Sequence, residues 1–345
     1  MYRSIYISKN EWKVIYHLPS SKTLREIARN TGMCLSSVQN TLTKLYRKGR
    51  VYFVPDYGKF GLIPIALIVE PTVIEELPYG TVSVRNIYGG GRILKLISAL
   101  IPYVFLEEYC NSIPANILIL IRGLKYYRWR PDDGGTLYLP EKGTLIPVFS
   151  NIFTKEEYPE NNCFREVENI TPDIYDLIIL SAKLHRGPFI RHKEALKEAL
   201  KIDQSIALTS SQTLSYHFKR HVMPAWLYNT FIPYLPMNEV PFRLFYIKGK
   251  EAHIVARSLI KLPYFSTALI DVNTALVLGQ PPCFMHERIF ELLTMFDIEF
   301  PYGEIIMSSK SIVKSTPYLW KFVRWDGGRW VWWWPEERLR VRVRK

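Results

Sequence analysis

The sequence of 345 residues predicts an α+β fold in which one plan occurs twice in the chain. The plan is a block of three short helices followed by a block of strands and helices. Two observations predict it. Helix-start signals and apolar residues at helical spacing recur near residues 8–47 and 171–222, and apolar runs of strand length follow both segments. The length also suits two to four domains.

Residues 8–47 are expected to form three helices joined by a tight turn. Ser8 and Thr23 are each followed three residues later by Glu, which fits a capping box at the start of the first two helices. Gly32 makes the turn before the third helix, because glycine tolerates a positive φ. The third helix spans residues 35–47 and a strand follows it, so the segment predicts a winged helix-turn-helix.

The outer face of this third helix carries hydroxyls, amides and cations but no acid: Ser36, Ser37, Gln39, Asn40, Thr43, Lys44 and Arg47. Amides and hydroxyls can read base edges, whereas Lys and Arg neutralise phosphates. We therefore expect these residues to bind DNA, together with Lys59 in the segment that follows the strand. A solvated helix face without such a role is the alternative.

Blocks of strands and helices follow both helical segments. The first contains four expected strands and a helix: strands at 62–70, 81–88, 103–109 and 115–122, and a helix at 92–101. Residues 124–160 are expected to be an irregular extension. The second has the order strand, helix, strand, strand, helix, strand: 242–248, 251–262, 265–272, 274–278, 283–296 and 304–307. This is the complete βαββαβ plan of a ferredoxin-like domain, and the first block is most of one.

The second helical block repeats the plan of the first. Its helices are expected from Thr171-Pro172 onward, at residues 191–200, and after a cap at residues 209–211. The outer face of its third helix again has no acid: Ser211, Gln212, Ser215, Tyr216, Lys219 and Arg220. We place these residues in a second DNA-binding surface.

The C-terminal residues 310–345 are rich in Trp and Arg. Four arginines alternate with apolar residues and so share one face of a strand: Arg338, Arg340, Arg342 and Arg344. Three interpretations are open. The tail packs on the second ferredoxin-like sheet as an edge hairpin, it forms a dimer contact, or it contacts nucleic acid, since Arg pairs with phosphates and Trp stacks on bases.

The run Gly-Met-Cys-Leu-Ser-Ser-Val at residues 32–38 precedes Leu42, Leu45, Gly49 and Val51. This pattern resembles the DNA-binding domain of Lrp/AsnC-type regulators. The following segment, residues 57–69, is similar to that family's passage into its ferredoxin-like ligand-binding domain. Cys34 departs from the family, because a Ser or Thr usually caps the recognition helix at that position.

The resemblance implies winged helices that bind double-stranded DNA, and ferredoxin-like domains that form a homodimer and bind a small-molecule effector. A duplicated arrangement then predicts five segments: a winged helix at 1–58, a ferredoxin-like domain with its extension at 59–160, a second winged helix at 161–238, a second ferredoxin-like domain at 239–309, and the basic tail at 310–345. We expect the two halves to fold separately.

The composition indicates a polyanionic partner. A formal net charge of +13 and a pI near 9.4 favour nucleic acid or an anionic membrane surface. No apolar run approaches the roughly 18–20 residues of a membrane span, and the first residues lack a signal-peptide pattern. We therefore expect a cytoplasmic, nucleoid-associated protein without a membrane partner. Abundant Ile, Tyr, Lys and Arg are typical of a thermophile. The family resemblance implies that the source is archaeal.

Signatures of catalysis and of metal binding are not evident. The four cysteines show no C-x-x-C spacing. His217 and His221 could share a metal ion, but no third ligand lies at a useful spacing, so neither a metal nor another cofactor is predicted. No Ser/His/Asp elbow, Walker loop or HExxH motif is present. A fused pair of Lrp-like halves is also the plan of siroheme decarboxylases, but the Tyr/Arg/His cluster of that enzyme is not evident.

The predicted function is that of a sequence-specific transcription regulator whose winged helices bind DNA and whose ferredoxin-like domains serve dimerisation or effector sensing. The alternative is an architectural or replication- or chromosome-associated DNA-binding protein. A metabolic enzyme on the same architecture is the third hypothesis, and we expect no enzyme.

Overall fold

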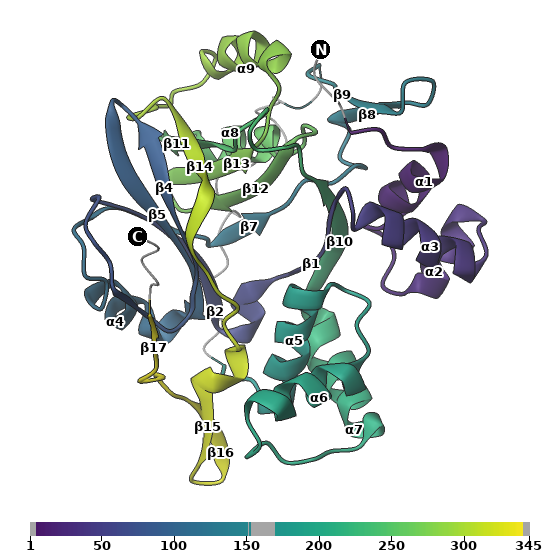
Figure 1. Ribbon diagram of the computed structural model, residues 1–345, viewed down its shortest axis with the longest axis vertical. Helices are drawn as coiled ribbons and strands as arrows, with labels where there is room; N and C mark the ends of the chain where they lie inside the picture. Colours follow the sequence, from purple (N-terminus) through teal and green to yellow (C-terminus); the bar gives the residue numbers. More distant parts are fainter. Residues whose placement is uncertain (1–4, 151, 153–169, 341–345) are drawn as a thin grey trace.

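A nine-stranded antiparallel sheet is the centre of the computed structural model, which describes residues 5–150, 152 and 170–340. Its strands lie in the order β6-β2-β5-β4-β14-β11-β13-β12-β7 (Figure 1). Their bounds are β2 (Leu62–Val69), β4 (Thr81–Gly89), β5 (Arg92–Pro102), β6 (Ile117–Arg122), β7 (Lys125–Tyr127), β11 (Arg243–Lys248), β12 (Phe265–Ile270), β13 (Thr274–Gly279) and β14 (Glu304–Lys314). The predicted α+β mixture of helices and strands is confirmed.

Both halves of the sheet have the same strand order. Numbered within each half, it is 4-1-3-2 for β6-β2-β5-β4 and for β14-β11-β13-β12. In the second half, α8 (Ala252–Leu259) and α9 (His286–Leu293) make the two crossovers of a βαββαβ unit. In the first half, α4 (Leu106–Asn111) makes the second crossover, whereas β3 (Glu76–Pro78) and its flanking loops replace the helix of the first.

Two strands outside the large sheet pair with each other, and each of them follows one of the two helical blocks along the chain. The helices are α1 (Lys9–His17), α2 (Leu24–Thr31), α3 (Leu35–Leu45), α5 (Ile174–Arg186), α6 (His192–Ile202) and α7 (Ser211–His217). The strand after the first block, β1 (Gly49–Pro55), pairs antiparallel with β10 (Trp226–Pro233), which follows the second block. Figure 1 shows both blocks beside this β1–β10 ribbon. The first block therefore has no hairpin wing of its own among the described residues.

Local sequence signals place the first three helices as predicted. The backbone N–H of Ser8 donates to the Glu11 carboxylate at 2.7 Å, and the Glu11 N–H donates to the Ser8 hydroxyl, which closes the capping box. Gly32 ends α2 with φ of 69°. Cys34 makes no side-chain cap bond to α3, as its chemistry predicts.

The predictions for residues 92–109 are wrong. The expected helix at 92–101 is strand β5, and the expected strand at 103–109 is a turn followed by α4. Gly90 and Gly91, both with positive φ, make the tight turn of a hairpin between β4 and β5. Side chains of β5 are buried on both faces of the sheet, so apolar residues occupy most of its positions and their periodicity does not distinguish it from a helix.

The extension after β6 is more regular than predicted. Beyond β7 it contains a hairpin of β8 (Thr136–Leu139) and β9 (Thr144–Pro147). Trp129 is buried, and the ring of Tyr138 stacks on that of Trp12 with 5.0 Å between centroids. The extension thus attaches the first helical block to the second half of the sheet.

The C-terminal tail continues from the end of β14 and packs against α5 and β3, and not on the edge of the second ferredoxin-like sheet. Trp320 and Phe322 are buried in a core that they share with α5. The hairpin of β15 (Val323–Asp326) and β16 (Arg329–Trp332) follows, and β17 (Arg338–Arg340) then pairs with β3. Part of the tail is thus a paired strand, as one of the three interpretations expected, but its partner is β3 and not the second ferredoxin-like sheet.

Each helical block packs against the strands of the other half. Val14, Ile27 and Leu45 of the first block share a core with Phe245 and Val255 of the second half. In the same way, α5 to α7 share a core with β2 and β5. A third core contains side chains from both halves of the sheet. The hydrophobic cores therefore do not follow the order of segments along the chain.

Candidate functional site

A cation lies among tyrosine rings where the β1–β10 ribbon meets the large sheet. The guanidinium carbon of Arg128, just after β7, is 3.7 Å from the ring centre of Tyr52 and 5.3 Å from that of Tyr126. Its Nη1 donates to the Thr267 hydroxyl at 3.3 Å. No described carboxylate lies within ion-pair distance of Arg128. We call Arg128 with Tyr52, Tyr57, Tyr126 and Tyr234 the Arg128 cluster.

Four different elements supply the tyrosines of the Arg128 cluster. Tyr52 comes from β1, Tyr57 from the 3-10 turn that follows it, Tyr126 from β7, and Tyr234 from the residue after β10. The rings of Tyr57 and Tyr126 meet edge to face at 5.3 Å, and the hydroxyls of Tyr52 and Tyr234 are hydrogen-bonded. The ribbon and the sheet must both be in place to form this group.

Hydrogen bonds from β10 hold the backbone at Arg128. The Tyr228 hydroxyl accepts from the Arg128 N–H and donates to the Arg128 carbonyl, each at 2.9 Å. The Thr230 hydroxyl donates to the carbonyl of Trp129 at 2.6 Å. Tyr228 and Thr230 are both buried, so water does not compete for these bonds. These hydrogen bonds therefore fix the backbone position from which the Arg128 side chain extends.

The electrostatics of the Arg128 cluster favour an anion. Burial raises the pKa of Tyr57, Tyr126 and Tyr234, so their hydroxyls keep their protons at neutral pH and can donate. The Arg128 guanidinium keeps its charge at any physiological pH. A cation in an enclosed site is costly without a counter-charge. The Arg128 cluster thus offers one full positive charge and several hydroxyl donors to an oxyanion.

Sequence reasoning missed this cluster because its members lie far apart along the chain. The pairing of β1 with β10 brings Tyr52 and Tyr234 together, and no local pattern predicts that pairing. One signal was present. Residues 126–130 read Tyr-Tyr-Arg-Trp-Arg, a run of aromatics and cations within a segment that was expected to be irregular.

A second polar group forms around the two histidines that sequence reasoning had paired. Asp176 of α5 lies beside His217 and His221, and these three residues could hold a metal ion. Sequence reasoning found no third ligand because Asp176 is distant in the chain and belongs to a capping box at the start of α5. The structure thus brings a third possible ligand beside the two histidines.

The residues predicted to bind DNA lie at three separate places. On α3, Ser36, Gln39, Asn40, Thr43, Lys44 and Arg47 are exposed and Ser37 is half-buried; on the second block, Ser211, Gln212, Tyr216, Lys219 and Arg220 are exposed and Ser215 is half-buried. Lys59 instead donates to the Pro224 carbonyl at 3.2 Å and joins two parts of the chain. The residues therefore do not form one continuous described site.

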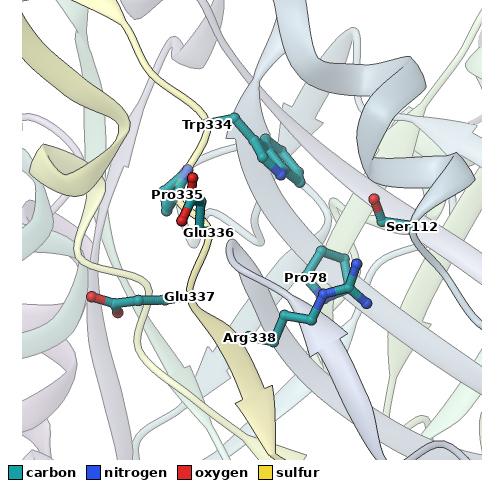
Figure 2. A pocket seen from close by; sticks show the side chains of 7 residues that line it. All are labelled: Pro78, Ser112, Trp334, Pro335, Glu336, Glu337 and Arg338. Carbon is teal, nitrogen blue, oxygen red and sulfur yellow. The ribbon is translucent and has the colours of Figure 1, made fainter.

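The arginines of the tail have protein neighbours. The Arg340 Nε lies 3.7 Å from the Glu76 carboxylate on the paired strand β3. Arg338, Glu337, Trp334 and Ser112 are among the residues that line a hollow of about 270 Å³; the Arg338 side chain extends past Pro78, and the Glu337 side chain points away from it (Figure 2). Glu337 there accepts from Lys321 at 2.6 Å. Arg342 and Arg344 lie outside the described residues, and this hollow shares no residue with the Arg128 cluster.

Comparison with known proteins gives two matches. No protein-family model and no curated protein match this chain. Two crystal structures of the siroheme decarboxylase NirDL align with it, the second in complex with an iron-uroporphyrin III analogue. The sequence identities are 10% and 12% and the TM-scores 0.43 and 0.41, over 88% and 90% of this chain and 92% and 93% of the solved chains.

The predictions of a DNA-binding transcription regulator and of a protein without enzymatic activity are contradicted, because both aligned structures are of an enzyme. A structural reason accompanies this correction: β1 pairs with β10, so the hairpin wing expected after α3 is not formed. Double-stranded DNA as the partner, the nucleoid location and the architectural alternative gain no support. At these identities and TM-scores, neither a substrate nor a mechanism follows from the matches.

One further finding concerns membranes. In the part of the chain that the structure describes, no helix combines the length and the apolar character needed to cross a bilayer.

Proposed function

We propose that the chain is an enzyme that acts on a small molecule bearing carboxylate groups, which it binds at the Arg128 cluster. The observation that carries this proposal is the Arg128 guanidinium, enclosed by tyrosines and without a described carboxylate partner. A guanidinium presents its N–H donors as a fork that matches the two oxygens of a carboxylate. Tyrosine hydroxyls add donors, and the rings provide flat apolar surface for the rest of the ligand.

Decarboxylation is the reaction that these groups fit best. When a carboxylate leaves as CO2, the C–C bond breaks and its electron pair stays on carbon, which then takes up one proton. A tyrosine whose pKa is raised by burial is a poor base, but it can give its proton to so basic a centre. Solvent then restores the hydroxyl proton. Arg128 would hold a second carboxylate of the substrate and so orient the reacting group.

The fold itself supports a further proposal. Two features are those that a tandem of two Lrp-like halves would show. The two halves of the sheet have the same strand order, and a block of three helices with one strand precedes each half. The boundaries at residues 58, 160, 238 and 309 and the duplicated winged helix and ferredoxin-like plan belong to this proposal. Binding of a small molecule belongs to the proposed activity, and homodimer formation stays a prediction.

Binding and turnover test the proposed activity. Purified protein is titrated calorimetrically with di- and tricarboxylic acids, siroheme and iron-uroporphyrin III, and release of labelled CO2 is followed for each compound that binds. We expect Arg128→Gln to weaken binding by roughly 10–150-fold, because a hydrogen bond to a charged group contributes about 1.5–3 kcal/mol.

Arg186→Gln is the matched control, because Arg186 lies on the surface in an exposed pair with Glu198. It should bind the ligand like the unmodified protein. Equal binding by the Arg128→Gln and Arg186→Gln proteins would refute the assignment of the site. Tight binding without any CO2 release would refute decarboxylation while leaving the carboxylate site in place.

A further inference from the structure

Two histidines and two aspartates converge in the second helical block. The Nδ1 atom of His217 is 2.9 Å from Asp176 Oδ1, and the Nδ1 atom of His221 is 3.0 Å from each oxygen of the same carboxylate. Asp173 Oδ1 lies 3.9 Å from His217 Nδ1. None of these residues belongs to the Arg128 cluster, so this group is independent of the proposed enzymatic activity.

The backbone fixes the direction of each side chain. Asp173 is the N-cap of α5, and its N–H donates to Asp176 Oδ2 at 3.2 Å, which orients the Asp176 carboxylate. His217 ends α7, and His221 lies in the π-helical turn Phe218–Val222 that continues it. A single π-helical turn in an α-helix is uncommon and is often found at functional sites. Here the end of α7 and the π-helical turn that follows it together bring both imidazoles to one carboxylate.

The charge of Asp176 is not balanced by a permanent cation. Only 4% of its side chain is exposed, and among the described residues its ion-pair partners are the two histidines, without a Lys or Arg. Neutral imidazoles can donate hydrogen bonds to the carboxylate, but they bring no charge. A buried carboxylate is stable when it is paired or coordinates a metal. A bound cation would supply the missing charge.

The spacing of the donor atoms suits a small metal ion. Metal–nitrogen and metal–oxygen bonds of about 2.0–2.2 Å separate neighbouring ligand atoms by about 2.9–3.5 Å, depending on the geometry. The measured separations of 2.9 and 3.0 Å lie at the short end of this range. His221 has 42% of its side chain exposed, so one side of the group is open to solvent. Water or a small anion could occupy the remaining coordination positions.

We propose that Asp176, His217 and His221 bind one divalent transition-metal ion of the kind that imidazole and carboxylate ligands take, such as Zn²⁺ or Fe²⁺. The ion holds α5 and the π-helical turn together and keeps an open position toward solvent. Two imidazoles and one carboxylate with open positions are a donor set used by metal ions that activate water or oxygen.

Metal titration of the full chain tests the proposal. Protein dialysed against chelator and then against buffer is titrated with Co²⁺, whose visible absorption reports its coordination, and with Zn²⁺ by calorimetry. One equivalent is expected to bind per chain. His221→Gln is expected to weaken binding at least 10-fold and to remove the rise in Tm that Zn²⁺ causes in the unmodified protein. His221 is largely exposed, so this variant retains the core.

Two controls exclude other ligands. His17→Gln changes a histidine on α1, outside the group, and should bind like the unmodified protein. Hydrogen bonds from Ser36 and Ser37 lower the pKa of the exposed Cys34 thiol to about 7, and a thiolate can bind Zn²⁺ by itself. All titrations are therefore repeated with Cys34→Ser present. The proposal is overturned if no saturable site is found in the Cys34→Ser protein, or if His221→Gln and His17→Gln bind the metals equally.

Discussion

The ion pair between Arg122 and Asp271 closes the curled sheet and permits a quantitative prediction. Arg122 is the last residue of β6, and Asp271 directly follows β12. In the sheet, β6 is one edge strand and β12 lies next to the other edge strand, β7. Asp271 accepts from the guanidinium of Arg122 at 2.9 Å at both of its oxygens and from the backbone N–H of Arg122 at 3.0 Å. The carboxylate is 8% exposed, whereas the guanidinium side chain is 37% exposed.

Replacing Asp271 with Ala should lower the free energy of unfolding by about 3 kcal/mol. Each hydrogen bond to a charged group contributes about 1.5–3 kcal/mol, and the substitution removes the three from Arg122 and a fourth from the Val272 N–H, which donates to Asp271 Oδ1 at 2.8 Å. The loss is smaller than their sum because Arg122 is partly exposed and water can solvate it after the substitution. Removal of one partner from a fully buried pair costs about 3–5 kcal/mol, so the expected value lies at the low end of that range.

Urea unfolding followed by circular dichroism at neutral pH measures this change. The matched control is Glu198→Ala, because Glu198 forms a similar two-bond pair with Arg186 on the surface, where the side chains are 38% and 64% exposed. An exposed pair of this kind contributes about 0–1 kcal/mol. If Asp271→Ala costs no more than Glu198→Ala, the assigned role of the pair in closing the sheet is refuted.

Two further predictions concern the first helical block and the division of the chain. Burial acts to raise the pKa of Glu11, but hydrogen bonds from Lys48 and Ser8 lower it below its usual value of about 4.5. Ionised Glu11 therefore stabilises the fold above that pH. This stability is lost as the pH falls through the pKa that Glu11 has in the folded protein. The Tm difference between the unmodified protein and Glu11→Gln should therefore shrink from pH 6 to pH 3, and a constant difference would contradict this. Contrary to the expectation from the sequence that the halves fold separately, fragments 1–160 and 161–345 should each unfold without cooperativity and regain a cooperative transition when mixed. The reason is that β1 pairs with β10 and each helical block packs across the halves. Cooperative unfolding of both separate fragments would contradict this prediction.

Elements whose signals are local could be predicted from the sequence. The capping box at Ser8 and the turn at Gly32 depend on residues within a few positions, so their chemistry is readable in order along the chain. The second βαββαβ unit was likewise predictable, because its strands and helices alternate with clear turns. Residues 92–111 were not, since a strand covered on both faces loses the alternation that marks a strand.

The two candidate sites could not be predicted because each depends on contacts between distant segments. Tyr52 and Arg128 meet only when β1 and β7 are assembled, and Asp176 meets His217 only when α5 packs beside α7. In both cases one of the residues has a local explanation in the sequence. Asp176 reads as part of a helix start, and Arg128 lies in a segment whose composition suggests a loop. A residue with an evident local role gives no sequence signal for a second role that depends on a residue in a distant segment.

The β1–β10 ribbon makes the halves of the chain dependent on each other at the Arg128 cluster. Tyr52 comes from the strand after the first helical block, Tyr228 comes from the strand after the second, and Tyr234 is the next residue after that strand. Arg128 follows the first half of the sheet along the chain and directly succeeds β7, which pairs with β12 of the second half. A single half would therefore lack either the cation or part of the hydroxyl set. If the cluster is the catalytic site, covalent linkage of the two halves keeps its parts together at any protein concentration, which a dimer of separate halves would not do.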